Sequence, residues 1–538
     1  MDHRTFRPTA EQDTIVRGMG TGRDQVVVAR AGTGKTSTLE YGSHVDTTPA
    51  LYVVFNAANR KEAQRRFPTH VKPVTGHSLA FGPMIAQNQG YRRKFDNASG
   101  GRRILPMDVA EAADLNYLHG ASGNQQAAMI LRTISQFQYS ASDTIEIGHV
   151  PDDAIPKRFL KPGNEAEKQD LIGETIKASK EIWDRMANAS DPFPILHDTY
   201  LKLFSLQDPD ITNRGRYQRI LADEWQDANP VLAQILDRQN AQKIYVGDPH
   251  QQIYSWRGAV NALEEKRQAG VDTSYLSTSF RFGNEVAAVA NILLESMGES
   301  TLMRGAGEAA RGFDTSQRHT VIGRKNITLF ERAVEAIENK EPFALVGGAR
   351  DIVRLLESGL ALQEGRMDQV KDPDLKLYTS WTEAKEISEM MQDKAMISLI
   401  KVIDRYGRRA LDFVDDLERA GEVDERSVNL VLSTAHRSKG REFPQTFLCE
   451  DLKVGEDIIS KLKDGTPLSA QEQESMNVLY VASTRCQYSM KFDPDIRDEF
   501  MQIRDINRAN RSKRVNQKIE VVPEDTMEGH SQSAPGPG

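Results

Sequence analysis

Short apolar runs, each bounded by polar or turn-forming residues, recur along this chain at intervals that suit buried strands. They are Gln25–Ala29, Leu51–Phe55, Arg219–Ala222, Lys243–Val246, Thr320–Ile322, Phe343–Val346, Asn429–Ser433 and Gln445–Cys449. Continuous apolar character, without strict alternation, predicts parallel strands that are covered on both faces. Stretches with helical spacing lie between them, at Asn59–Phe67, Val231–Arg238 and Glu285–Ser296. This alternation favours a doubly wound α/β fold, and the strand count suits two sheets.

Two long segments interrupt the alternation and predict insertions. Residues 86–192 are mostly polar and helical in character, and a smaller segment of the same kind covers 351–424. The expected α/β domains are therefore 1–85 with 193–277, and 278–350 with 425–500. Residues 501–538 are basic and then rich in Gly, Pro and Ser, which predicts a disordered tail. Its charges are either a contact for DNA or a protein partner, or an ordinary solvated surface.

Composition narrows the class of protein without choosing its ligand. The 538 residues exceed what one core usually serves, and 39% hydrophobic with 27% charged residues is typical of globular proteins. No apolar run approaches the roughly 20 residues that span a bilayer, and no secretory signal is visible, so we expect a cytoplasmic protein without membrane contact. Cys449 and Cys486 are too few for a disulfide framework. A net charge of −8 still allows a local basic groove.

A glycine-rich turn follows the first predicted strand. The segment ARAGTGKT, Ala29 to Thr36, lies between that strand and a helix start, which is the context of a phosphate-binding P-loop. Its backbone N–H groups would surround a β-phosphate, Lys35 would neutralise β/γ charge, and the Thr36 hydroxyl would bind Mg²⁺. The loop residues predicted to bind nucleotide are Ala31, Gly32, Thr33, Gly34, Lys35 and Thr36.

Two further predicted strands end in residues suited to hydrolysis. ILADEWQD places Asp223 and Glu224 at a strand end, where both carboxylates can face one site. Asp223 is predicted to hold Mg²⁺ and Glu224 to deprotonate the attacking water. In IYVGDPHQQIYSWRGA, Gln251 could sense the γ-phosphate. The same segment contains Tyr254, Trp256 and Arg257. Such residues form either a stacking surface for single-stranded DNA or part of a core.

In this order, AGTGKT, DEWQD and GDPHQQIYSWRGA resemble the P-loop, acidic and coupling motifs of UvrD/Rep/PcrA-like superfamily 1A DNA helicases. The resemblance implies an α/β protein with two RecA-like P-loop domains, parallel sheets flanked by helices, and a mostly helical insertion in each. It also implies an ATP- and Mg²⁺-dependent motor that moves 3′→5′ on single-stranded DNA and acts at junctions with duplex.

Other family motifs can be matched by residue around the nucleotide. RPTAEQDTIV contains Gln12, which by resemblance reads adenine. LSTSFRFG implies that Phe280 stacks on adenine and that Arg281 contacts the γ-phosphate. STAHRSKGREF and NVLYVASTRC imply nucleotide-site roles for Glu442 and Arg485. The predicted catalytic set is Lys35, Glu224, Gln251, Arg281 and Arg485.

The resemblance also implies a DNA-binding set, drawn from VVFNAANRKEAQRRF, VTGHSLA and STAHRSKGREF. Phe55 is implied to stack on a base, whereas Thr75 and His77 would meet the DNA backbone. The implied contacts are Phe55, Asn56, Thr75, His77, Thr434 and His436, with Tyr254, Trp256 and Arg257 from the coupling motif.

Finer detail points to one branch of the family. FNAANRKEAQRRF, HDTYLKLF and SFRFG look most like the F-box DNA helicases, but no F-box stretch precedes Gln12, so ubiquitin-ligase activity is not expected. Ser37, also in the nucleotide site, stands where UvrD and PcrA have an arginine beside adenine, which leaves one face of the base open. Arg441 replaces a usual leucine and Ser475 a usual glutamate.

Three functions stay open at this point. A helicase that unwinds duplex DNA uses the full motif set. A DNA-stimulated translocase that powers a partner, such as a nuclease, would use the same set without unwinding alone, and the short second insertion keeps this alternative. A P-loop switch that signals without DNA would need none of the aromatic residues. No metal-nuclease constellation is visible in the sequence.

Overall fold

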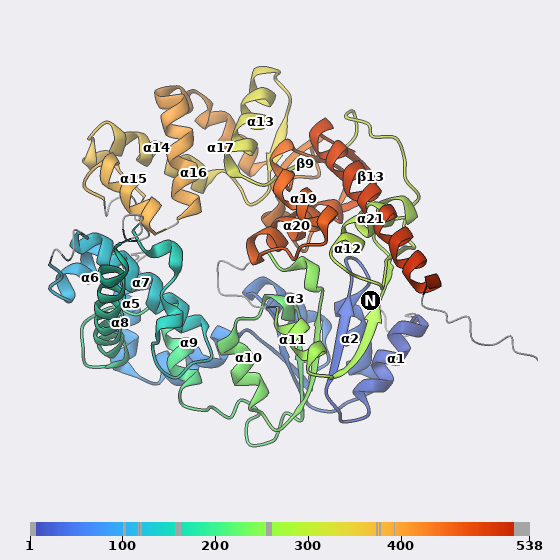
Figure 1. Cartoon of the computed structure of the whole chain (residues 1–538), viewed down its shortest axis with the longest axis horizontal. Coiled ribbons are helices and arrows are strands. Elements are labelled where there is room, and N and C mark those ends of the chain that lie inside the picture. Colours follow the sequence, from blue (N-terminus) through green and yellow to red (C-terminus); the bar gives the residue numbers. More distant parts are fainter. Residues whose placement is uncertain are drawn as a thin grey trace, which may run out of the picture.

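Two parallel sheets organise the protein. The computed structural model describes residues 7–99, 104–116, 118, 121–156, 159, 163–253, 261–372, 375, 378–391 and 393–520. In this part of the chain a six-stranded and a five-stranded sheet are each flanked by helices, and a two-stranded sheet lies between them in sequence (Figure 1). The predicted α/β class with two parallel sheets is therefore confirmed.

The first sheet has the strand order β3-β2-β4-β5-β1-β6. Its strands are β1 (Gln25–Ala29), β2 (Ala50–Val53), β3 (Val71–Val74), β4 (Arg219–Ala222), β5 (Gln242–Gly247) and β6 (Asp272–Leu276). Val26 and Val28 pack into one core whereas Val27 and Ala29 pack into another, so both faces are covered. We call each large sheet, together with the helices that flank it, a body. The helices of the first body are α1 (Ala10–Met19), α2 (Lys35–Val45), α3 (Ala57–Arg66), α4 (Gly76–Phe81), α9 (His197–Ser205), α10 (Pro230–Asp237) and α11 (Ala262–Gln268).

The second sheet has the order β10-β11-β9-β12-β13. Its strands are β9 (His319–Gly323), β10 (Phe343–Leu345), β11 (Leu430–Thr434), β12 (Phe443–Leu448) and β13 (Cys486–Phe492). Its helices are α12 (Asn284–Ser296), α13 (Asn326–Glu338), α18 (Ala435–Ser438), α19 (Glu456–Asp464), α20 (Ala470–Ser483) and α21 (Pro494–Glu520). The short strands β7 (Thr278–Ser279) and β8 (Arg304–Gly305) pair where the chain passes from the first body to the second.

Three strands of the two large sheets were not predicted from the apolar pattern, namely β3, β6 and β13, and neither were the short strands β7 and β8. Each lies at the edge of its sheet, where part of the strand faces solvent. The sequence VKPV of β3 has an exposed Lys72, and DTSYL of β6 begins with an exposed Asp272. These edge strands carry polar residues because they are less completely covered than the central strands, whereas the edge strand β10 is apolar and buried and was predicted.

Two groups of helices interrupt the sheets. The helices α5 (Gln89–Ser99), α6 (Pro106–Ala112), α7 (Gly123–Tyr139) and α8 (Glu165–Ala187) precede β4, whereas α14 (Arg350–Gln363), α15 (Trp381–Met390), α16 (Lys394–Tyr406) and α17 (Val414–Glu422) separate β10 from β11. Helix α15 contacts α7, and Met391 packs against apolar residues of both groups. The two groups therefore meet on the side of the molecule away from α21 (Figure 1).

The expectation of a disordered tail from residue 501 is wrong for its first part. Helix α21 continues to Glu520, and Ile496, Phe500 and Ile503 on one of its faces are buried. The side chain of Asn507 donates to the Ile292 carbonyl of α12 at 2.8 Å. The spacing of these residues is helical, but the surrounding charged residues hide it in a composition count. Residues 521–538 lie outside the described part of the chain.

No helix among the described residues combines the length and apolar character needed to cross a membrane.

Candidate nucleotide and DNA sites

The glycine-rich turn joins β1 to α2 in the conformation that a P-loop requires. Gly32 and Gly34 have φ angles of 73° and 81°, in the left-handed region that favours glycine. A Cβ on Gly32 would also approach the Ser279 Oγ atom to 2.6 Å. Glycine is therefore required there both by conformation and by the close passage of the chain that leads to the second sheet.

Two carboxylates at the end of β4 face this loop. The Lys35 ammonium donates to both carboxylate oxygens of Glu224 at 3.0 Å. The Thr36 hydroxyl donates to Asp223 Oδ2 at 3.4 Å. Glu224 has a φ of 51°, uncommon outside glycine. This turn ends the strand and lets two adjacent carboxylates face the same loop.

The charges of this cluster set which groups are ionised. Burial opposes ionisation of Glu224, yet the charges of Lys35 and Lys439 and a hydrogen bond from Gln226 lower its pKa to about 2. Burial, followed by the charge of Glu224, raises the pKa of Asp223. Burial opposes protonation of Lys35, but the two carboxylates raise its pKa overall. Glu224 is therefore ionised and can act as a base. It is held by Lys35, the same cation that would bind a phosphate.

Thr36 and Asp223 offer oxygen atoms of the kind that Mg²⁺ prefers. They come from the P-loop and the end of β4, so an ion between them would lie beside the phosphates that the loop holds. Mg²⁺ usually keeps several waters and needs one or two carboxylates, which fits this donor pair. Among the described residues no cluster of three or more His, Cys, Asp or Glu side chains could hold a metal ion.

Two arginines of the second body reach the same place. The buried Arg485 guanidinium, at the end of α20, lies 3.5 Å from the Gln251 side-chain oxygen. Arg281 donates to Glu442 at 3.1 Å and to the Thr484 carbonyl at 2.8 Å. Burial, followed by the charge of Arg281, lowers the pKa of Arg485 to about 9. With a pKa of about 9 the Arg485 guanidinium is cationic at neutral pH, and the charge of Arg281 acts on it from nearby.

Gln12, Phe280 and Ser37 surround the loop on its outer side. An ideal Cβ on Gly34 would lie 3.2 Å from the Gln12 amide nitrogen and 4.0 Å from the Phe280 ring. Phe280 is 50% exposed, which is unusual for an aromatic ring, and its backbone N–H donates to the Gly32 carbonyl at 2.9 Å. Arg66 of α3 donates to the Ser37 hydroxyl at 3.3 Å. An arginine is therefore present beside Ser37 after all, supplied by a neighbouring helix.

Side chains of the second body also contact the segment that follows β5, from Gln251 to Ile253. The Lys439 ammonium contacts Asp227 and donates to the Gln251 carbonyl at 2.6 Å. A ring nitrogen of His436 lies 3.1 Å from the Ile253 carbonyl, and the Asn477 amide donates to the Gln252 carbonyl at 2.9 Å. The stretch from Gln251 to Ile253 is therefore held to the second body by side chains from α18, α20 and the loop after α18.

The residues implied to bind DNA follow β2, β3 and β11. Asn56 and Thr75 cap α3 and α4, and Thr434 caps α18 while almost fully buried. His77 lies 3.2 Å from Asp198. Phe55 is partly exposed at the end of β2. Tyr254, Trp256 and Arg257 lie outside the described residues.

Strand order separates these residues from the nucleotide. Phe55 and Thr75 follow β2 and β3 at one side of the first sheet, whereas the P-loop follows β1 near the other side. The strands β4 and β5 lie between them, and Glu224 and Gln251 are in the turns that follow these two strands. The hydrolytic residues therefore stand between the two candidate binding regions.

Several residues in the site were not anticipated from the sequence. Tyr52 of β2 donates a hydrogen bond to Asp223, and Gln226 donates to Glu224 at 2.7 Å. Asp227 and Lys439 form the contact between the bodies described above. A polar ring at a buried strand position is the only sequence signal for Tyr52. Lys439 gives a stronger one, since it stands inside the STAHRSKGREF segment.

Known proteins resemble this chain over most of its length. Residues 126–269 match the family described as UvrD/REP helicase N-terminal domain. The F-box DNA helicase protein 1 of Schizosaccharomyces pombe is 31% identical over 509 residues, which span 89% of this chain and 56% of that protein. The F-box DNA helicase 1 of Gallus gallus is 28% identical over 500 residues, spanning 86% and 47%.

A bacterial relative matches a shorter stretch at higher identity. The probable DNA helicase II homolog of Mycoplasma genitalium is 37% identical over 299 residues, which span 51% of this chain and 41% of that protein. The chain spans about half the length of the curated relatives it matches.

Proposed function

Since this chain belongs to the UvrD/Rep helicase family, we propose that it is an ATP-driven motor that moves along single-stranded DNA and unwinds duplexes. The division into two RecA-like domains with an insertion in each, at the boundaries expected from the sequence, is part of this proposal. The 3′→5′ direction and the DNA substrate rest on resemblance. One observation carries the proposal most directly: Arg485 of one body contacts Gln251 of the other beside Lys35 and Glu224.

ATP would bind by replacing contacts that the site now makes with itself. The triphosphate would take Lys35 from Glu224, which frees the carboxylate to accept a proton from water. Thr36 and Asp223 would hold Mg²⁺, which supplies charge neutralisation at the phosphates. Gln12 and Phe280 would read and stack on adenine, with Ser37, Arg66 and the loop backbone along the other side.

The second body would supply the positive charge that hydrolysis needs. Arg281 and Arg485 repel each other in this structure, and a γ-phosphate placed between them would remove that repulsion. Glu442, which now pairs with Arg281, would hold that side chain in place. A ligand shifts an equilibrium between conformations only by its differential affinity for them, and a γ-phosphate held from both sides provides this difference.

DNA would lie across both bodies at the ends of β2, β3 and β11. The phosphates would meet the start of α3 and α4, where Asn56, Thr75 and His77 lie. Phe55 would stack on a base, and Thr434 and His436 would contact the strand from the second body. Stacking is worth about 1–3 kcal/mol per base, enough to hold position and weak enough to exchange in each cycle.

ATPase rate with and without an oligothymidylate, in the wild type and in Glu224→Gln, tests this proposal. We expect stimulation in the wild type and a loss of about 10²- to 10⁴-fold in the variant, because the base is removed while the shape is kept. Nucleotide binding should persist in Glu224→Gln. An ATPase that ignores single-stranded DNA would contradict the proposal and favour a DNA-independent switch.

A forked duplex then separates unwinding from translocation alone. Strand separation with ATP and Mg²⁺ supports the helicase, whereas stimulated ATPase without separation supports a translocase that powers a partner such as a nuclease. The second insertion consists of four α-helices, α14 to α17, in the described part of the chain, and its contact with α7 is the feature such a partner would have to accommodate.

A further inference from the structure

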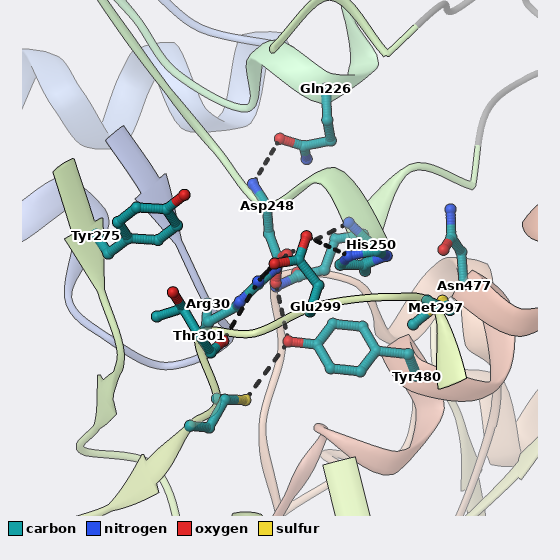
Figure 2. A network of polar contacts seen from close by, with 12 residues as sticks. Arg30, Gln226, Asp248, His250, Tyr275, Met297, Glu299, Thr301, Asn477 and Tyr480 are labelled. Carbon is teal, nitrogen blue, oxygen red and sulfur yellow. Dashed lines mark hydrogen bonds and ion pairs between the residues drawn. The ribbon is translucent and has the colours of Figure 1, made fainter. Parts of the chain in front are cut away.

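A buried network of charged side chains joins the two bodies behind the P-loop (Figure 2). Its centre is Arg30, the residue between β1 and the glycine-rich turn, whose side chain is fully buried. One nitrogen of its guanidinium lies 3.2 Å from Asp248, at the end of β5, and another lies 2.6 Å from Glu299, which follows α12. Arg30 therefore bonds one carboxylate of its own body and one of the other.

The second body contributes two more groups to the network. Glu299 also lies 3.0 Å from His250 of the first body. The Tyr480 hydroxyl of α20 donates to Asp248 at 3.0 Å, and the Thr301 carbonyl accepts from Arg30 at 3.5 Å. In Figure 2 the side chains of Arg30, Glu299 and His250 converge with Asp248 and Tyr480 on one point. Three charged residues and their polar partners thus connect the two bodies behind the P-loop.

The burial of these groups makes the contact hard to exchange. Asp248 is fully buried and the Glu299 side chain almost so. Burial opposes ionisation of Glu299, yet the hydrogen bond with His250 and the charge of Arg30 lower its pKa to about 2. The Arg30 Nε atom has no hydrogen-bond partner among the described residues, so Asp248, Glu299 and the Thr301 carbonyl determine its orientation.

The chain crosses between the bodies at the same point. The Arg30 N–H donates to the Leu276 carbonyl at the end of β6 at 3.0 Å, and the Phe280 N–H donates to the Gly32 carbonyl at 2.9 Å. The covalent connection and the buried ion network therefore coincide. A motion of one body about the other has its smallest displacement at such a point.

Asp248 extends the network into the hydrolytic site along two routes. Its carboxylate accepts from the Gln251 amide at 2.8 Å, and Gln251 contacts Arg485. Its backbone N–H donates to the Gln226 oxygen at 3.0 Å, while the Gln226 amide donates to Glu224. A shift of Asp248 would therefore displace both the residue that meets the second-body arginine and the residue that orients the base.

We propose that Arg30 and Glu299 are positioning residues that form a fixed ionic pivot between the two bodies and hold Asp248, and through it Gln251 and Gln226, in register with the γ-phosphate. The inference rests on the proposed motor function. Opening and closing of the nucleotide site then take place about the pivot, and its loss lets the bodies drift so that Arg485 and Glu224 are aligned together less often.

The test compares Arg30→Met and Glu299→Gln with a control that removes another buried arginine. Arg219 of β4 is almost fully buried, bonds Asp46 and Gln242, and lies at the opposite end of its strand from Glu224. Each variant is assayed for urea unfolding, for binding of a fluorescent ATP analogue, and for ATPase kcat with saturating oligothymidylate.

We expect Arg30→Met and Glu299→Gln to lower kcat about 10- to 100-fold, since small misplacements of catalytic groups have effects of this size. Their affinity for the ATP analogue should change less than about threefold. The control Arg219→Met should unfold at lower urea, as Arg30→Met does, yet keep kcat within about twofold. The kcat of the double variant should be no lower than that of the slower single variant, because both changes break the same contact between Arg30 and Glu299.

Equal loss of kcat in the control, or unchanged kcat in Arg30→Met and Glu299→Gln, would overturn the pivot. If Arg30→Met does not fold, Glu299→Gln decides by the same criteria, because it keeps the side-chain shape and an acceptor for His250. A wild type without stimulation by oligothymidylate contradicts the proposed function itself. A stimulated wild type with unaffected variants contradicts only the pivot.

Discussion

Lys35 and Arg30 are two cations close together in sequence whose ion pairs differ in their exposure to solvent. The Lys35 side chain is 14% exposed and its partner Glu224 22%, whereas Arg30 and Asp248 are both at 0%. A pair that a ligand can reach can exchange partners at small cost, but separating a fully buried pair leaves an uncompensated charge. The P-loop therefore has an ion pair that a nucleotide can replace, Lys35 with Glu224, and a buried one behind it, Arg30 with Asp248, that stays in place.

Apart from Glu224→Gln, which removes the catalytic base, the largest loss of ATPase rate is expected for Arg485→Lys. A lysine keeps the charge but loses the planar fork, and losing an arginine of this kind costs about 10³-fold or more in rate. ATPase kcat with saturating oligothymidylate measures it.

Arg441→Lys serves as the matched control, because the Arg441 side chain pairs with Glu425 at the surface. It should keep kcat within about twofold. A mild effect at Arg485, comparable to that of the control, would mean that the second body does not touch the transferred phosphate.

A moderate change in ATPase kcat is expected when pH changes the charge of Asp227, which contacts Lys439 of the second body. Burial raises the pKa of Asp227 to about 6, although the charge of Lys439 opposes the shift. Below pH 6 the carboxylate is protonated and Lys439 loses its charged partner. We expect kcat to fall about tenfold between pH 7 and pH 5, and Asp227→Asn to be slow and lack this step.

Stability should move in the opposite direction at this residue. A raised folded-state pKa means that the folded protein binds the proton more tightly than the unfolded chain, whose Asp pKa is about 3.9. The stabilisation is complete below pH 4 and is lost as pH rises through about 6. Urea unfolding of the wild type and Asp227→Asn across this range measures it. A difference between the two proteins that is constant with pH would show that Asp227 does not titrate in this window.

The smallest effect is expected for Phe280→Ala, at the outer side of the nucleotide site. Removing a stacking ring costs about 0.5–1.5 kcal/mol, so the ATP KM should rise about 2- to 12-fold while kcat changes little. Steady-state kinetics with ATP and GTP would also show weaker preference between the bases. An unchanged KM would place adenine elsewhere.

The sequence predicts the nucleotide-facing pair of Lys35 and Glu224 far better than the buried contact of Arg30 with Glu299. Lys35, Thr36, Asp223 and Glu224 stand in short segments where a strand end dictates the position of the side chain. Arg30 pairs with Glu299 from the other body, and no local pattern links two residues so far apart. Its position beside the P-loop makes it look like a variable residue of the turn.

The fold shows the same division between local and distant information. Central strands such as β1 and β4 are continuously apolar and were predicted from that pattern, whereas the edge strands β3 and β6 were not. Helix α21 was missed because its buried Ile503 and Phe500 are scattered among charged residues. Burial at an edge or on a helix face is decided by a neighbouring element, which composition does not reveal.

The central claim is that one ATP is held by both bodies, and spin-label distances test it most directly. Labels at Val45→Cys in α2 and Met501→Cys in α21 would report across the bodies, because both positions are exposed whereas Cys449 and Cys486 are buried. We predict that a non-hydrolysable ATP analogue shifts and narrows the distance distribution, that ADP does not, and that Arg485→Lys abolishes the shift. An identical distribution with and without the analogue, in a protein that still hydrolyses ATP, would contradict the account.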